Sequence, residues 1–151
     1  TISNLTMPLK IYSIDRIEIE KAVLSWIELL SNGRYDEAYQ STLHDPYYQW
    51  SPSNIKDIIN GYGLPDEQSE EKYKVTSPES AIINGNINPY KDIDFFDYAI
   101  RKIDERHDMT IIGYVIYDLP INGEWSDLSA TFRILQTDNF LMLELNEIHV
   151  L

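Results

Sequence analysis

The feature that constrains this chain most is a strict alternation of apolar and polar residues near its C-terminal end. From Asp127 to Ile134 every second side chain is apolar, and those between are polar or charged. The predicted buried side chains of this segment are Leu128, Ala130, Phe132 and Ile134. The alternation resumes after a Thr-Asp-Asn turn, with apolar residues at every second position from Leu141 to Leu145. A period of two is that of a strand with one buried face, so the sequence predicts two strands of a half-buried antiparallel sheet.

The stretch before these strands contains a hairpin signal. Asn122-Gly123 lies between two apolar segments, and this dipeptide favours a two-residue turn in which both residues have positive φ. Residues 110–117 are rich in β-branched and aromatic side chains and are apolar on both faces, as in a central strand. The sequence therefore predicts a sheet that contains 110–117, 126–135 and 140–150.

The segment before this sheet has a less definite pattern. From Lys72 onward, Tyr73 and Val75 alternate with charged or small neighbours, which favours strand. The bulky residues of 91–103 fit one face of a helix and fit a strand as well. We favour a strand to about Tyr98, followed by a charged loop to Asp108.

The N-terminal part has the pattern of an amphipathic helix. Asp15 precedes Glu18 by three residues, the spacing of a capping box. Apolar residues then recur at helical spacing until Asn32-Gly33, a typical C-terminal stop. The sequence predicts a helix over 16–31.

Two shorter helices are expected after it. Residues 34–41 place aromatic and small side chains on one side. Ser51-Pro52 combines an N-cap residue with proline at the first helical position, which predicts a third helix ending at Gly61 or Gly63.

These elements fit a single domain over 1–151, because this length is that of one domain. It divides into a loose arm (1–14), a helical part (15–63) and a part made mainly of strands (72–151). Helices first and strands afterwards is the order of an α+β fold, in which helices pack on one face of a curved antiparallel sheet.

Charge limits the classes of partner. The chain has 25 acidic and 12 basic residues and a formal net charge of −13. Such a field repels nucleic acids and anionic membranes and attracts a basic partner. The absence of cysteine excludes disulfides and thiolate chemistry and fits a cytoplasmic protein. The chain begins with Thr1 rather than Met, which leaves room for a removed signal peptide.

No sequence motif indicates a cofactor. The three histidines, His44, His107 and His149, lack a second histidine or a cysteine at ligand spacing. The glycines are scattered, without a phosphate-binding loop or a nucleophile elbow. We therefore expect no bound metal and no organic cofactor, which elemental analysis of protein purified without chelator would test.

Helices that lead into a curved antiparallel sheet resemble the cone-shaped fold of nuclear transport factor two, a cystatin-like α+β architecture. The stretch 118–132 and the ending Leu-Glu-Leu-Asn-Glu-Ile-His-Val-Leu (143–151) are more narrowly similar to the C-terminal half of a small family of uncharacterised bacterial proteins. That family carries no assigned activity. The wider fold implies isomerases and dehydratases, ligand binders, or partners of secreted toxins, and fold alone does not choose among them.

A cofactor-free isomerase or dehydratase is one reading of the strand residues. Asp127 or Glu144 would act as a base in an apolar pocket that raises its pKa, and His149 is a further catalytic candidate. The aromatic residues expected around the base are Trp26, Tyr48, Trp50 and Tyr114. An ordinary solvent-facing carboxylate is the simpler interpretation.

The reading that we favour is a non-enzymatic acidic binding protein. Its expected contacts are the acidic loop residues Asp66, Glu67, Glu70 and Glu71, with Trp125 and Tyr48 as apolar anchors. An immunity-type partner of a basic toxin is the sharpest version of this hypothesis. A homodimeric structural or regulatory domain, which pairs the open sheet face with its own copy, is a third alternative.

Overall fold

The structure is a computed structural model that describes residues 8–66, 70–83, 88–97, 102–104 and 109–151. Within these ranges the chain has an α+β fold, in which three N-terminal helices precede most of a mixed, mainly antiparallel sheet. The helices are α1 (Arg16–Ser31), α2 (Tyr35–Gln40) and α3 (Pro52–Asn60). The predicted fold class is confirmed.

The two longer helices begin at the predicted caps. The carboxylate of Asp15 accepts a hydrogen bond of 2.9 Å from the Ile17 N–H, and Ser51 Oγ accepts one of 3.0 Å from the Asn54 N–H. Each bond satisfies a backbone donor that the first turn leaves without a helical partner. After α1, Gly33 has a φ of +73°, as the predicted stop requires.

Removal of the α3 cap is expected to lower stability measurably. Ser51→Ala should lower the free energy of unfolding by about 1 kcal/mol, because the Asn54 N–H loses its acceptor. Denaturant titration of Ser80→Ala provides the matched control, since Ser80 is exposed and lies in a turn outside the helices. Equal losses in the two variants would contradict a capping role for Ser51.

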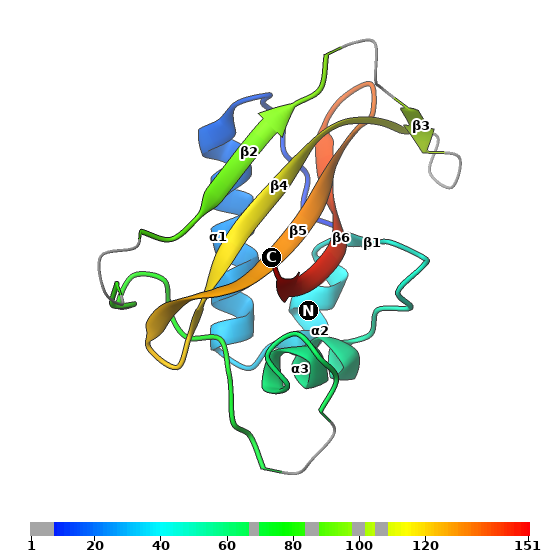
Figure 1. Cartoon of the computed structure of the whole chain (residues 1–151). Helices are drawn as coiled ribbons and strands as arrows, with labels where there is room; N and C mark the ends of the chain where they lie inside the picture. Colours follow the sequence, from blue (N-terminus) through cyan, green and yellow to red (C-terminus); the bar gives the residue numbers. More distant parts are fainter. Residues whose placement is uncertain (1–7, 67–69, 84–87, 98–101, 105–108) are drawn as a thin grey trace, which may run out of the picture.

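The sheet has six strands among the described residues, in five positions (Figure 1). They are β1 (Leu43–His44), β2 (Lys91–Phe95), β3 (Lys102–Asp104), β4 (Met109–Ile121), β5 (Glu124–Gln136) and β6 (Leu141–Val150). The order is β1-β6-β5-β4-β2, and β3 pairs with β4 beside β2. The short β1 runs parallel to β6, and the other pairs are antiparallel.

The β4–β5 hairpin turns at the predicted dipeptide. Asn122 and Gly123 have φ values of 51° and 86°, which satisfies the two positive φ angles of the expected turn. The strand before the turn is longer than predicted, because it continues to Ile121 through a register shift between Asp118 and Pro120. Proline lacks a ladder N–H, and such an irregularity accommodates it within a strand.

In the segment 91–103, which fits a helix or a strand, the first residues form the strand β2, as we favoured. The charged loop expected up to Asp108 is wrong in part, because β3 (102–104) pairs with 109–111 of β4. The edge of β4 beyond β2 is open there, and this pairing satisfies its backbone groups. Residues 98–101 and 105–108, which include His107, lie outside the described ranges. Val75 makes only an isolated bridge, to Ile121.

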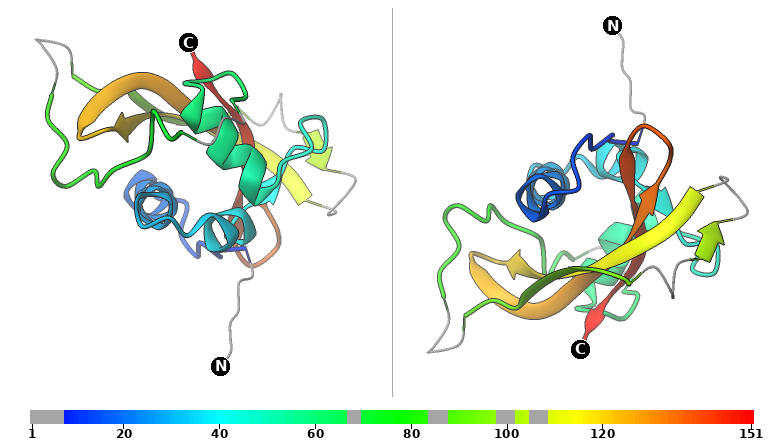
Figure 2. Two further views of the ribbon diagram at one scale, coloured as in Figure 1. Left: turned by 90° about the horizontal axis from the view of Figure 1, so that it is seen from below. Right: turned by 90° about the horizontal axis from the view of Figure 1, so that it is seen from above.

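The predicted apolar face of β5 is the one that the helices cover. Leu128, Ala130, Phe132 and Ile134 are all buried, and Phe132 meets Trp26 of α1 edge-on, with ring centroids 5.1 Å apart. Figure 2 shows α1 and α2 on one side of the curved sheet. The other side of the sheet, here called the open face, carries the alternate residues.

A bulge in β6 changes which residues reach the open face. Thr131 pairs with Glu147 whereas Phe132 pairs with Leu145, so Asn146 is an extra residue. Leu145 and Ile148 consequently both face the helices. Without the bulge, the strict alternation of this strand would have placed Glu147 in the core.

The segment before α1 is held to β6 at one point. Ile11 is buried and exchanges backbone hydrogen bonds of 2.8 and 2.6 Å with Leu141. This pairing fixes part of the predicted N-terminal arm (1–14), of which residues 1–7 lie outside the described ranges.

Candidate functional site

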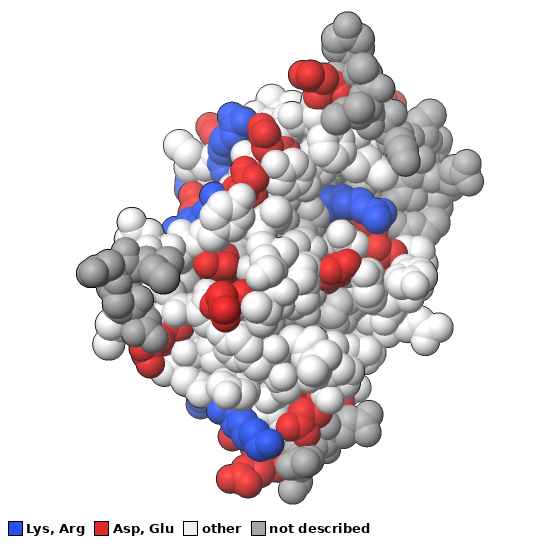
Figure 3. Space-filling view, viewed as in Figure 1, with Lys and Arg blue, Asp and Glu red and all other residues white. Residues whose placement is uncertain are grey.

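The open face brings residues of four strands, most of them polar, into rows, because residues paired across adjacent strands share a face. Three such rows run from β2 or β4 to β6. The rows are Asp94–Tyr114–Arg133–Glu144, Asp92–Ile116–Thr131–Glu147 and Asp118–Ser129–His149. Figure 3 looks onto this face, and acidic side chains are spread over it with few basic ones among them. The open face is therefore an acidic surface of the protein.

Tyrosine hydroxyls hold three carboxylates of this face. Tyr62 Oη donates to Asp127 Oδ1 at 2.5 Å, and Tyr114 Oη donates to Asp92 Oδ2 at 3.0 Å. Tyr48 Oη donates to Glu147 Oε1. No Lys or Arg among the described residues lies within 4.0 Å of these three carboxylates. A phenol is a neutral donor, so this bond orients each carboxylate without adding a compensating charge.

The same contacts raise the pKa of the tyrosines. The hydrogen bond to Glu147, followed by burial, raises the pKa of Tyr48 to about 12. The bond to Asp92 is the main cause that raises the pKa of Tyr114. Burial, and then the bond to Asp127, raises the pKa of Tyr62. The hydroxyls accordingly remain protonated donors throughout the physiological range.

The Tyr48–Glu147 bond predicts a specific alkaline transition. Unfolded tyrosine titrates near pH 10 and Tyr48 in the folded protein at about 12, so its contribution to stability is complete below pH 10. That contribution is lost as the pH rises through about 12. Glu147→Gln should lower the pKa of Tyr48 toward 10. Spectrophotometric tyrosinate titration, with Tyr48→Phe to identify the residue, checks this expectation. An unchanged titration in Glu147→Gln would contradict the assigned contact.

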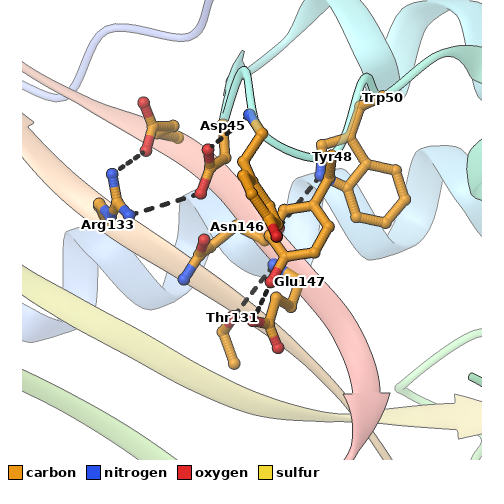
Figure 4. A network of polar contacts seen from close by, with 9 residues as sticks. Asp45, Tyr48, Trp50, Thr131, Arg133, Asn146 and Glu147 are labelled. Atoms are coloured by element: carbon orange, nitrogen blue, oxygen red, sulfur yellow. Dashed lines mark hydrogen bonds and ion pairs between the residues drawn. The ribbon is translucent and has the colours of Figure 1, made fainter.

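Arg133 lies between two carboxylates on the open face (Figure 4). Its Nη1 is 3.2 Å from Glu144 Oε1, and its Nη2 is 3.4 Å from Asp45 Oδ2. Glu144 is fully buried, whereas the Arg133 side chain is 38% exposed. The Tyr47 N–H donates to Asp45 Oδ1 at 2.9 Å, which orients that carboxylate. One cation thus faces two anions, and the cluster adds to the acidic character of the face.

The β6 bulge and the loop after β1 position the Tyr48–Glu147 pair. Trp50 Nε1 donates to the carbonyl of Asn146, the bulge residue, at 3.1 Å. Thr131 Oγ1 accepts a bond of 3.1 Å from the Glu147 N–H. As Figure 4 shows, Tyr48 reaches from the loop over β6 to Glu147. The loop thereby anchors the aromatic side chain beside the carboxylate.

A hollow of about 420 Å³ lies at the hairpin end of the open face. Its lining, within the described residues, is Tyr62, Tyr73, Asn88, Pro89, Asp118, Ile121, Asn122, Glu124, Trp125, Ser126 and Asp127. The hollow brings together the sequence candidates Asp127 and Trp125, which we had assigned to different roles. Both carboxylate oxygens of Asp118 accept hydrogen bonds, from Ser129 Oγ at 2.6 Å and from the Tyr90 N–H at 2.7 Å.

The predicted catalytic residues do not meet in one apolar pocket. Glu144 faces Arg133, and Asp127 is exposed at the hairpin end. His149 Nδ1 is 2.9 Å from Glu147 Oε2, although without the geometry of a hydrogen bond. Trp26 packs in the core on the helix side of the sheet. Among the described residues, no group of three or more metal-ligating side chains is arranged to hold an ion.

Three of the four carboxylates predicted as partner contacts in the acidic loop lie within the described residues. Asp66 Oδ2 is 3.5 Å from Lys72 Nζ, so part of its charge is compensated. Glu70 and Glu71 are exposed, and Glu67 lies outside the described residues.

Sequence reasoning missed Tyr62, Asp92 and Glu147. The alternation in β5 predicts that Asp127 lies on the polar face, but no local pattern in the sequence indicates that Tyr62 lies beside it.

Comparisons with known proteins add no relative. A scan against protein-family models finds no matching family, and searches of curated proteins and of solved structures find no match. None of the helices in the described part of the chain is long and apolar enough to cross a membrane. The site therefore has to be interpreted from its own chemistry, as an acidic, tyrosine-rich sheet face on an α+β domain.

Proposed function

We propose that this chain is a non-enzymatic binding protein that docks a basic protein partner on its open face. The observation that carries the proposal is the set of carboxylates Asp92, Asp127 and Glu147. Each is held by a tyrosine hydroxyl and is free of a Lys or Arg among the described residues. Lys and Arg side chains of a partner would supply the missing cations.

Preorganisation favours this role. A flexible surface carboxylate loses conformational entropy when it binds, and part of this cost is avoided where a hydrogen bond already holds it. Tyrosine also adds apolar contact area, and it is enriched in protein interfaces. Tyr47, 82% exposed, and Tyr48 stand together at the β6 edge of the face. They would form an aromatic anchor beside Glu147.

The net charge supports fast association with such a partner. Opposite fields raise association rates by roughly 10–10³-fold, and salt removes the effect. The screening length falls from about 10 Å at 0.1 M salt to about 3 Å at 1 M salt. The acidic loop with Asp66, Glu67, Glu70 and Glu71 would contribute to this long-range field, while the open face would make the short-range contacts.

The proposal predicts different kinetics for two charge-neutralised proteins. The face variant, Asp92→Asn with Asp127→Asn and Glu147→Gln, should slow association about tenfold and also speed dissociation. The loop variant, with its four carboxylates changed to Asn and Gln, should slow association and leave dissociation unchanged. Stopped-flow measurements with the partner recovered from source-cell extract, at low and high salt, would distinguish them.

Two results would contradict the proposal. One is a capture experiment that returns only acidic or neutral proteins. The other is an association rate that does not respond to salt. Circular dichroism of both variants provides the folding control, because each change replaces a carboxylate with the isosteric amide.

An immunity-type protein that neutralises a cationic toxin is the most specific version that we propose, with action in the cytoplasm. The cone-shaped, cystatin-like form inferred from the sequence belongs to the same proposal, and the order of helices and curved sheet supports it. A neighbouring gene that encodes a secreted toxin domain would favour this version directly.

A small-molecule pocket protein, or a cofactor-free isomerase or dehydratase, is the second candidate. It is favoured by the hollow at the hairpin, which contains Asp127 beside Tyr62. It is disfavoured by the position of Glu144, the other predicted base, which is fully buried against Arg133 and does not line that hollow. Homodimer formation through the open face would bring like charges together, which costs free energy.

A further inference from the structure

The geometry points to the hollow at the β4–β5 hairpin as a receptor for one guanidinium group, the side chain of an arginine presented by the partner. The identity of the partner rests on the proposed function, but the chemistry of the hollow does not. Its lining within the described residues has three carboxylates, from Asp118, Glu124 and Asp127, and no Lys, Arg or His. A bound cation would therefore offset the negative charge of these carboxylates.

The carboxylates differ in what they can offer a ligand. Both oxygens of Asp118 already accept hydrogen bonds from within the protein. Asp127 uses Oδ1 for the Tyr62 hydroxyl, and its Oδ2 has no hydrogen-bond partner among the described residues. Glu124 is exposed and makes no ion pair with any described Lys or Arg. Asp127 and Glu124 are therefore the groups that can bind a cation directly.

An aromatic pair supplies the apolar part of the site. The rings of Tyr62 and Tyr73 have centroids 5.1 Å apart and planes inclined by 58°. Tyr73 is 39% exposed, so its ring is open to a ligand. The ring of Trp125 already makes a cation–π contact, with Lys91 Nζ 5.4 Å from its centroid. We therefore assign the two tyrosines as the cation–π partners of the ligand.

Carboxylates beside aromatic rings favour a guanidinium ligand over an ammonium ligand. A guanidinium is planar, stacks on aromatic rings and forms paired hydrogen bonds with a carboxylate. It is also less strongly hydrated than an ammonium, so its removal from water costs less. A volume of about 420 Å³ accommodates one such side chain and leaves room for water.

The test is a titration with N-acetyl-arginine amide, followed by amide and indole NMR signals of the labelled protein. We expect a dissociation constant on the order of 1 mM, with shifts concentrated at the Trp125 indole and residues 122–127. Asp127→Asn and Glu124→Gln should each weaken binding about tenfold. In Asp127→Asn the amide oxygen still accepts from Tyr62, so the fold is kept. Glu147→Gln is the matched control, because it removes the same charge from the open face outside the hollow.

Three outcomes would overturn the inference. The first is equal binding of N-acetyl-citrulline amide, which has nearly the same shape and no charge. The second is equal binding of N-acetyl-lysine amide, which would remove the assignment to guanidinium. The third is unchanged affinity in both hollow variants.

This inference and the proposed function can fail separately. If the arginine amide does not bind while a basic partner still associates in a salt-dependent way, the hollow is not the receptor and the proposed function stands. If the amide binds in the hollow and no basic partner exists, the proposed function fails and the hollow remains a guanidinium site.

Discussion

Replacement of Phe132 with Ala is expected to lower the free energy of unfolding by about 3–5 kcal/mol, and Leu143→Ala should lower it by about 2–5 kcal/mol. Phe132 is 1% exposed and meets Trp26 edge-on, and Leu143 lies on the adjacent strand in the same buried cluster. Truncation of either side chain removes apolar burial and leaves a cavity that the rigid sheet cannot fill completely. Denaturant unfolding followed by circular dichroism measures both losses.

Leu64→Ala is the matched control for these variants. Leu64 is 74% exposed, so the same chemical change should alter stability by no more than about 0.5 kcal/mol. Losses below that value at both Phe132 and Leu143 would mean that the faces of β5 and β6 are assigned the wrong way round.

Arg133→Met is expected to lower the free energy of unfolding by about 1–3 kcal/mol, because the buried Glu144 carboxylate loses a charged hydrogen-bond donor. Glu144 is fully buried and loses the guanidinium that faces its Oε1. Asp45, with only 9% of its side chain exposed, loses the same partner. The aliphatic stem of Met preserves the packing of the arginine stem, so the loss reports the charge rather than the volume.

A second change in the same protein separates charge from packing. The double variant Arg133→Met with Glu144→Leu should recover part of the lost stability, because the buried carboxylate that lost its cation is itself removed, while Asp45 still lacks its partner. Thermal and denaturant unfolding of the four proteins of this cycle gives the coupling free energy. A single variant as stable as the parent, or a double variant no better than the single, would show that Arg133 is not an important partner of Glu144.

The stability losses expected for Phe132→Ala and Arg133→Met come from side chains on opposite faces of β5. Phe132 points to the helices and Arg133 to the open face, so β5 supplies the core and the candidate site at successive positions. Substitutions at Asp92, Asp127 or Glu147 should affect partner binding with little change in stability. This separation allows the proposed function to be tested in proteins that remain folded.

Much of the fold follows from local patterns. The caps at Asp15 and Ser51, the turn at Asn122 and Gly123, and the buried face of β5 were all predictable. In each case the physical cause acts over a few residues. Capping joins residues two or three positions apart, the turn needs positive φ at adjacent residues, and strand alternation is a property of the extended backbone.

Other features could not be predicted because their cause is distant in sequence. The pairing of β3 with β4 depends on how much of that edge β2 leaves open. The bulge at Asn146 depends on the register between β5 and β6, and Trp50 bonds to its carbonyl across 96 positions of sequence. No window of the sequence contains both partners of such a contact.

The sequence by itself determined the α+β class, the helices and strands of the main sheet, the acidic net charge and the polar identity of one sheet face. These properties depend on composition and on short periodic patterns. Only the tertiary structure decided which carboxylates are oriented by a tyrosine hydroxyl without a described Lys or Arg beside them. The partners Tyr48 and Glu147 are separated by 99 positions, and Tyr62 and Asp127 by 65. They meet because α3 and the loop after β1 pack against the sheet, and the free energy of that packing is distributed over the whole core.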